Sequence, residues 1–374
     1  MSNHSFPDLM KQKRIIYVHG FASSAQSGTV QRLRETFPNT DIVAFDLPVN
    51  PFEAISLLKA KCAQLQPDLI LGTSMGGMYA EQLHGYDRIL VNPAFQIADT
   101  MREHNMMGKQ VFLNPRADGE REFYVDKALV KAYREVSEQC FNVQGVQGVQ
   151  EVQEVQGVQE VQEVQGVQEV QEVQGVQEVQ GVQDRDRVWG LFGDNDPLVH
   201  TFDLFHEHYP QAIHFHGEHR LDDHAFAHAV VPVIRWIDDQ QEHRQRPIVF
   251  VSYDAMHDSY GKPVSSLVKV VSRLIETYTV YFYAPCPTND HIYADRVQTW
   301  LEQHIAVPAY DHVVFTNQPQ LLYGDYFIMR SGSRGNEELK EEAPDMMGAV
   351  IAFGSDEFKT WEDILVYFDR LGGQ

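Results

Sequence analysis

The sequence predicts two α/β domains, each built on a parallel β-sheet with helices packed on its faces. Short apolar runs, with the length of buried strands, alternate with helix-like segments along most of the chain. Residues 238–247 form a polar stretch that interrupts this alternation and reads as a linker. A chain of 374 residues also exceeds one typical domain. We therefore expect one domain in residues 1–243 and a smaller one in residues 244–374.

The first domain is expected to alternate strands and helices in a doubly wound arrangement. Apolar runs predict strands at residues 14–20, 41–47, 68–74, 88–93, at the start of 188–199, and at 212–219. Helix patterns lie at residues 29–35, 51–65, 76–84 and 225–239. The helix at 51–65 opens with proline, which favours the first helical turn. Helices between successive strands favour a parallel sheet.

Residues 143–183 are an uninterrupted Val-Gln-(Gly/Glu) repeat inside the first domain. A period of three shifts each valine by about 60° around a helix, so the valines form no straight apolar stripe. The pattern does not alternate with period two either. We expect a solvated excursion without a function. The alternative is a partner-binding or self-associating segment, because Gln/Val-rich tracts can aggregate.

The strongest functional pattern is Gly72-Thr73-Ser74-Met75-Gly76-Gly77, which fits G-x-S-x-G. It lies between a predicted strand and a predicted helix, which is the context of a nucleophile elbow. Glycines flank the serine because neighbouring Cβ atoms would collide in such a tight turn. Ser74 is therefore the expected nucleophile. The alternative is a glycine-rich turn that contains a serine by chance.

A serine hydroxyl needs a base, and the base needs an acid that orients it. In a nucleophile-elbow fold the chain order is Ser, then Asp or Glu, then His. Asp196 fits the spacing G-x-x-D-x-x-V and is preferred to Asp194, although both could simply form a turn. His219 follows the last predicted strand of the domain, where the base belongs. It is preferred to His214, His216, His224 and His228.

Backbone N–H groups are expected to stabilise the oxyanion that forms when the serine attacks. One should come from Met75, directly after the nucleophile. The second should come from the loop after the first strand, His19-Gly20-Phe21-Ala22, through the N–H of Phe21 or Ala22. His19 is expected to anchor this loop and not to act as the base.

Three stretches of the first domain resemble the YqiA-like esterases, a bacterial α/β-hydrolase family. They are YVHGFASSAQSGTVQRLRE, LGTSMGGMYAEQL and LVNPAF. The resemblance extends over about residues 14–239 outside the repeat. It implies an α/β-hydrolase fold, activity on acyl esters or thioesters, and no metal or organic cofactor. It also implies the nucleophile, acid and base roles for Ser74, Asp196 and His219. The repeat departs from the family and could alter the substrate pocket.

Residues 248–371 resemble the haloacid dehalogenase-like superfamily, particularly its bacterial 5′-nucleotidase-type members, and the closing IAFGSDEFKTWEDIL carries much of the resemblance. This implies a Rossmann-like α/β domain. The family's D-x-D reads Ser252-Tyr253-Asp254 here, and Tyr283 stands where a Thr or Ser is expected. The family's D-D-R-P becomes Met329-Arg330-Ser331-Gly332. Since Mg²⁺ needs several carboxylate oxygens, we expect a catalytically degenerate domain with a structural, binding or regulatory role.

Charge and cysteine content narrow the expected partners and compartment. The formal net charge of −23 repels nucleic acid and anionic membranes, so neither is an expected partner. Cys62, Cys140 and Cys286 lie far apart, which argues against a disulfide framework or a thiolate zinc site. No apolar signal sequence or membrane-spanning run is recognised. We therefore expect a cytoplasmic protein.

Together these patterns favour a serine hydrolase that cleaves small-molecule acyl esters or thioesters without a cofactor. Two alternatives are kept. One is a non-catalytic interaction or regulatory protein in which both domains are inactive. The other is a residual phosphohydrolase in the second domain, which would depend on Asp254 and Mg²⁺. The sequence does not specify the acyl chain length, the physiological substrate or the oligomeric state.

Overall fold

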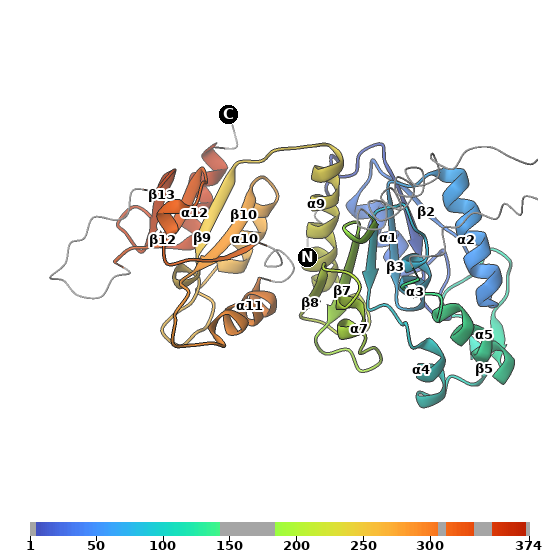
Figure 1. The fold of residues 1–374 in the computed structure, drawn as a ribbon. Coiled ribbons are helices and arrows are strands. Elements are labelled where there is room, and N and C mark those ends of the chain that lie inside the picture. The colour runs from blue at the N-terminus through green and yellow to red at the C-terminus, as the bar shows by residue number, and fades with distance from the viewer. Residues whose placement is uncertain (1–4, 143–183, 306–311, 333–345, 372–374) are drawn as a thin grey trace, which may run out of the picture. The chain divides into compact units, whose positions relative to one another are not determined.

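A computed structural model describes residues 5–142, 184–305, 312–332 and 346–371 (Figure 1). The chain divides into two compact units, the first with residues 1–192 and 196–212, the second with residues 193–195 and 213–374. Two parallel sheets are present, which confirms the predicted α/β class. The repeat at 143–183 lies outside the described residues, so its expected solvated excursion stays a prediction. The domain boundary after residue 243 also stays a prediction.

The first sheet has six strands in the order β2-β1-β3-β4-β7-β8. Parallel pairs join β1 to β2 and β3, β3 to β4, and β4 to β7. Because parallel strands point the same way, the loops after their carboxyl ends meet at one edge of the sheet. The strands are β1 (Arg14–Val18), β2 (Asp41–Ala44), β3 (Leu69–Thr73), β4 (Arg88–Val91), β7 (Val188–Gly193) and β8 (Ala212–Phe215).

Helices follow most of these strands, as the sequence predicts. Helix α2 begins at Pro51, where the Asn50 side chain accepts a hydrogen bond from the Phe52 N–H at 3.0 Å. Its buried residues Leu58 and Cys62 belong to the core of the first unit. The helices of this unit are α1 (Gly28–Thr36), α2 (Pro51–Leu65), α3 (Met75–Glu81), α4 (Ile97–Glu103), α5 (Lys127–Ser137) and α7 (Phe202–His206).

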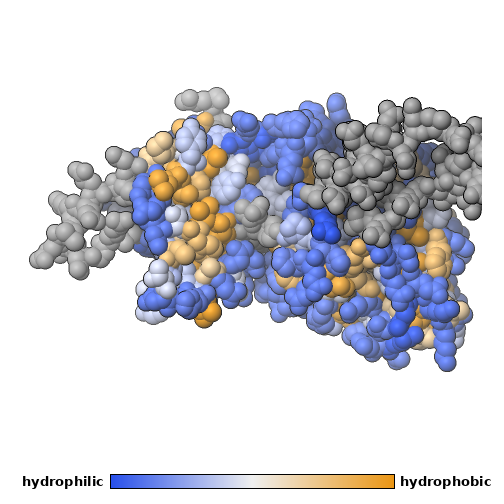
Figure 2. All heavy atoms as spheres, in the orientation of Figure 1, coloured by the Kyte–Doolittle hydropathy of each residue, from blue (hydrophilic) through white to orange (hydrophobic). Residues whose placement is uncertain are grey.

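An antiparallel hairpin of β5 (Gly108–Val111) and β6 (Glu122–Val125) was not predicted from the sequence. Each strand has four residues, and residues 112–121 connect them. This loop contains the pair Asp118-Gly119 but is longer than the two-residue turn that such a pair predicts. Val111 and Tyr124 are 61% and 68% exposed on one side, whereas Phe123 packs against the core. On the visible face, Figure 2 shows hydrophobic residues gathered in patches between hydrophilic ones.

The residues next to both ends of the repeat are tied to one region of the first unit. On one side, Phe141 donates its N–H to Glu81 Oε1 at 3.0 Å. On the other, Asp184 accepts from the fully buried Arg88 at 2.6 Å and also contacts His84. Burial alone would raise the Asp184 pKa, but the His84 hydrogen bond, the Arg88 charge and the Gly85 N–H together lower it.

The second unit contains a sheet of five parallel strands in the order β11-β10-β9-β12-β13. The sequence predicts a helix over residues 263–276, but Ser266 has a left-handed φ of 65° and α10 begins directly after it, at Leu267. The strands are β9 (Ile248–Ser252), β10 (Thr279–Ala284), β11 (Val313–Phe315), β12 (Tyr326–Arg330) and β13 (Ala349–Phe353). The helices are α8 (Asp223–Ala225), a π-helical turn (Phe226–Val230), α9 (Val231–Gln241), α10 (Leu267–Ile275), α11 (Tyr293–His304) and α12 (Trp361–Leu371).

Within the described ranges, none of the helices has both the length and the apolar character that crossing a membrane requires.

Candidate active site

Ser74 lies in a strained turn between β3 and α3, with φ 54° and ψ −120°. Left-handed φ is unfavourable for a residue with a Cβ, so neighbouring groups must hold it in place. The Ser74 N–H donates to Val91 O at 2.9 Å, and its carbonyl accepts from the Ala94 N–H at 3.0 Å. The turn is therefore fixed against β4, the next strand of the sheet.

The glycines around Ser74 are required by packing. A Cβ on Gly76 would lie 2.0 Å from Val18 O at the end of β1. A Cβ on Gly72 would lie 2.3 Å from Gly76 O, and one on Gly77 would lie 2.9 Å from Pro93 Cβ. Each of these separations is far below contact distance, so the G-x-S-x-G-G pattern allows α3 to approach the sheet closely.

The loop after β1 reaches the nucleophile. A Cβ built on Gly20 would lie 3.8 Å from Ser74 Oγ and 3.2 Å from Ser74 Cβ, so the backbone here runs beside the serine. In the described part of the chain, the N–H groups of Phe21, Ala22 and Met75 donate to no protein acceptor. Unpaired N–H groups beside a serine are what an oxyanion requires.

His19 anchors this loop, as expected. Its Nε2 lies 3.2 Å from the Leu47 N–H and its Nδ1 lies 2.9 Å from Gly20 O. Because an N–H can only donate, Nε2 must be the acceptor and Nδ1 must carry the proton. Burial lowers the pKa of His19, which is 3% exposed, and so favours this neutral form.

Asp196 lies in the loop after β7, at the same sheet edge as Ser74. Its side chain is buried, and Oδ1 accepts the N–H groups of Leu198 and Val199 at 2.8 and 3.1 Å. Thr201, farther along this loop, donates its hydroxyl to Pro93 O at 2.9 Å and so joins it to the loop after β4. The structure thus brings the loops of Ser74 and Asp196 together.

Asp194, the other candidate acid, bonds the loop after β8. It accepts the Gly217 N–H at 3.0 Å and lies 3.1 Å from His216 Nδ1, while its own N–H donates to Phe215 O. Both oxygens of the Asp194 carboxylate therefore take part in local hydrogen bonds to the loop after β8.

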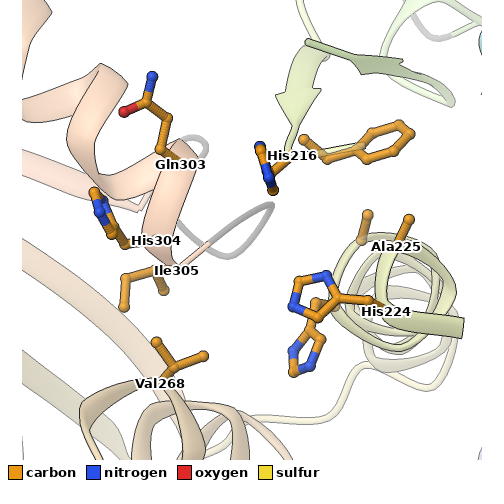
Figure 3. A pocket seen from close by; sticks show the side chains of 10 residues that line it. His216, His224, Ala225, Val268, Gln303, His304 and Ile305 are labelled. Carbon is orange, nitrogen blue, oxygen red and sulfur yellow. The ribbon is translucent and has the colours of Figure 1, made fainter. Parts of the chain in front are cut away.

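His219 lies in the loop after β8, half-buried, and belongs to the second unit. That His219 acts as the base for Ser74 stays a proposal. Three of the other candidate histidines line a small pocket of the second unit together with His304 (Figure 3): His216, His224 and His228. Burial, and then the neighbouring His224, lower the pKa of His228.

The groups that hold the loop after β1 were missed by the sequence reasoning. Asp46 accepts one N–H from that loop and another from residue 117, and Arg116 donates to Leu47 O at 3.1 Å. An acidic residue near the end of an apolar strand-like run, residues 41–47, was the available signal. Arg116 and Ala117 could not be foreseen as partners because they lie in the loop of the unpredicted hairpin.

In the second unit, two of the positions compared above with the haloacid dehalogenase-like motifs, Asp254 and Arg330, make hydrogen bonds to neighbouring residues. The Ser252 hydroxyl donates to the Asp254 carboxylate. Arg330 donates to the carbonyls of Asp254 and His257, each at 2.6 Å, and burial raises the pKa of Tyr283 to about 12. Among the described residues, no three or more His, Cys, Asp or Glu side chains form a group that could hold a metal ion.

Similarities to solved structures are distant. A soluble variant of monoglyceride lipase from Saccharomyces cerevisiae is 10% identical, covers 63% of this chain and 89% of its own, and gives a TM-score of 0.38. Est1E from Butyrivibrio proteoclasticus, with bound ferulic acid, is 14% identical, covers 64% and 92%, and gives 0.35. The thioesterase domain from the curacin biosynthetic pathway is 14% identical, covers 62% and 92%, and gives 0.34.

Among curated proteins, a putative 5'(3')-deoxyribonucleotidase of Vibrio phage KVP40 is 26% identical over 110 residues. The match covers 29% of this chain and spans about 60% of the phage protein.

Residues 14–230 match a protein family described as uncharacterised, UPF0227. The matched region includes β1 with its His-Gly loop, the Ser74 elbow, the Asp196 loop and His219, and it agrees with the extent of the first resemblance noted in the sequence. More than half of the chain lies within this match, and the chain accordingly belongs to the family UPF0227.

Proposed function

We propose that the chain is a serine hydrolase that cleaves carboxylic esters or thioesters of acyl groups, as YqiA-like esterases do. The observation that carries the proposal is the strained Ser74 turn, with its hydroxyl beside Gly20. Among the described residues, the N–H groups of Phe21, Ala22 and Met75 next to it in the chain donate to no protein acceptor. A buried aspartate at the same sheet edge supplies a candidate acid. The proposal places the hydrolase in residues 1–243 of a cytoplasmic protein.

In the proposed mechanism, His219 accepts the proton of Ser74 as Oγ attacks the acyl carbonyl. Asp196 holds the imidazole in the correct tautomer and stabilises its cation. The oxyanion accepts hydrogen bonds from Met75 N–H and from Phe21 or Ala22 N–H, and one such donor typically contributes about 100- to 1,000-fold in rate. His219 then protonates the alcohol or thiol that leaves, and water hydrolyses the acyl-enzyme.

The test is hydrolysis of p-nitrophenyl esters from acetate to palmitate, and of acyl-CoA thioesters, by wild type and Ser74→Ala. Turnover that Ser74→Ala abolishes, together with covalent labelling by a fluorophosphonate, would support the proposal. Ser137→Ala is the matched control, since this serine ends α5 and its hydroxyl donates to Arg134 O within the same helix. If wild type is inert on all substrates and unlabelled, a non-catalytic interaction role replaces the esterase.

Matched pairs test the acid and the base. Asp196→Asn should lower kcat far more than Asp194→Asn, because Asp194 is engaged in a local turn. His219→Gln should likewise lower kcat far more than His216→Gln. The reverse order in either pair would reassign that role.

For residues 244–374 we propose a haloacid dehalogenase-like domain without phosphatase chemistry. The support is the occupation of its motif positions by Ser252, Arg330 and Tyr283, with Arg330 bonded to backbone carbonyls. Phosphate release from deoxyribonucleotides should be absent with Mg²⁺ present. Release that Asp254→Ala abolishes would instead reveal a residual phosphohydrolase.

A further inference from the structure

The loop that carries the proposed oxyanion donors is held in an unfavourable conformation. Ala22 has a φ of 55°, which costs energy for a residue with a Cβ. Its carbonyl accepts the N–H of Leu113 at 2.7 Å, from the chain just beyond strand β5. The conformation of Ala22 therefore depends on a segment about ninety residues away along the chain.

Side chains reinforce this link between the loop and the hairpin. The fully buried Ser24 donates its hydroxyl to Pro115 O at 2.7 Å, and Asn114 Nδ2 donates to Ser23 Oγ at 3.2 Å. The rings of Phe21 and Phe123 meet edge to face with centroids 5.3 Å apart. Residues 20–25 and 113–117 are thus joined by hydrogen bonds between the two segments.

Asp46 joins both segments through one carboxylate. Its Oδ1 accepts the Ala25 N–H at 2.8 Å, and its Oδ2 accepts the Ala117 N–H at 2.6 Å. Hydrogen bonds to an ionised carboxylate are about twice as strong as neutral ones. Asp46 lies just after β2, and the next residue, Leu47, bonds the His19 anchor. The Asp46 carboxylate therefore links the loop that faces Ser74 to residues 113–117 by hydrogen bonds.

We propose that Asp46 is a positioning residue for the reaction, holding residues 20–25 against residues 113–117 so that the loop's N–H groups point at the oxyanion. In this role Asp46 acts through residues 20–25 and not on the reacting atoms. The inference rests on the proposed serine hydrolase function and extends it to the support of the oxyanion site.

Asp46→Asn is the most selective perturbation, because it preserves shape and replaces one acceptor oxygen by an NH₂ group. One of the two N–H groups then faces a donor and loses its bond. Oxyanion donors act on the transition state, so kcat should fall by about tenfold or more while KM changes little. Asp41→Asn is the matched control, since Asp41 begins the same strand at the opposite sheet edge and, among the described residues, its carboxylate accepts a side-chain hydrogen bond from Arg14 alone.

Three activity outcomes are distinguishable. A selective loss of kcat in Asp46→Asn, with Asp41→Asn unchanged, supports the inference. Unchanged kcat in Asp46→Asn overturns it when wild-type turnover depends on Ser74. Absence of any Ser74-dependent turnover in wild type refutes the proposed function instead, and the positioning is then decided by hydrogen exchange.

Amide hydrogen exchange is measured in the same three full-length proteins. Asp46→Asn should accelerate exchange in both residues 20–25 and residues 113–117, and Asp41→Asn in neither. Unaltered exchange in both segments overturns the positioning role whether or not esters are hydrolysed. If Asp46→Asn does not fold, Ser24→Ala, which removes the bond to Pro115 O, is expected to give the same selective loss.

Discussion

Replacing His19 should destabilise the first unit and disturb the loop that faces Ser74. The ring makes two buried hydrogen bonds, to Gly20 O at 2.9 Å and from the Leu47 N–H at 3.2 Å. In His19→Ala each lost bond costs about 1 kcal/mol, and the buried Leu47 N–H left without a partner costs about 1–3 kcal/mol more. We therefore expect the free energy of unfolding to fall by about 3–5 kcal/mol, with a lower kcat.

The same residue predicts how stability depends on pH. Burial lowers the His19 pKa in the folded state from its usual 6.5. A group whose folded-state pKa is depressed contributes its stability fully above the unfolded-state value, and this contribution is lost as the pH falls through the folded-state pKa. The stability advantage of wild type over His19→Gln, which does not titrate, should therefore shrink below about pH 6.5.

Urea unfolding followed by tryptophan fluorescence between about pH 5 and 8 measures both effects. His104→Gln is the control for the loss of an imidazole, because His104 is exposed at the end of α4. The reasoning fails if His19→Ala is as stable as wild type, or if the advantage over His19→Gln grows as the pH falls.

Three further changes test the packing and the repeat. Gly76→Ala should lower the thermal midpoint, because its Cβ would lie 2.0 Å from Val18 O and overpacking costs about 1–3 kcal/mol; an unchanged midpoint would contradict the close approach of α3. Arg88→Met should cost about 3–5 kcal/mol in urea unfolding, since it leaves the Asp184 carboxylate without its buried partner; a neutral effect would show that the pair contributes no net stability. Replacing residues 143–183 by a short Gly/Ser linker should change the unfolding free energy by about 1 kcal/mol or less, and failure to fold would give the repeat a structural role.

Local patterns sufficed for most of the fold and for part of the site. The bounds of α2 follow from Asn50, Pro51 and an apolar face, all of which act within a few residues. The elbow at Ser74 was predictable because its glycines are required within one turn. Helix α10 was placed less well, because the left-handed Ser266 delays its start and gives no distinctive sequence signal.

Long-range contacts determined the rest of the site. The β5–β6 hairpin and the Asp46 carboxylate, which bonds Ala25 and Ala117, connect segments far apart in the chain. Such pairings are set by the packing of whole elements, which no local pattern encodes.

By itself the sequence determined that this chain forms parallel α/β sheets and that a glycine-bounded serine follows a buried strand. Strand length, helix capping and the absence of a Cβ are properties of neighbouring residues, and they act locally. Only the tertiary structure decided what stands beside that serine. The backbone at Gly20 lies beside it, and His19 and Asp46 hold the loop that contains Gly20, because parallel strands gather their carboxyl-end loops at one edge of the sheet.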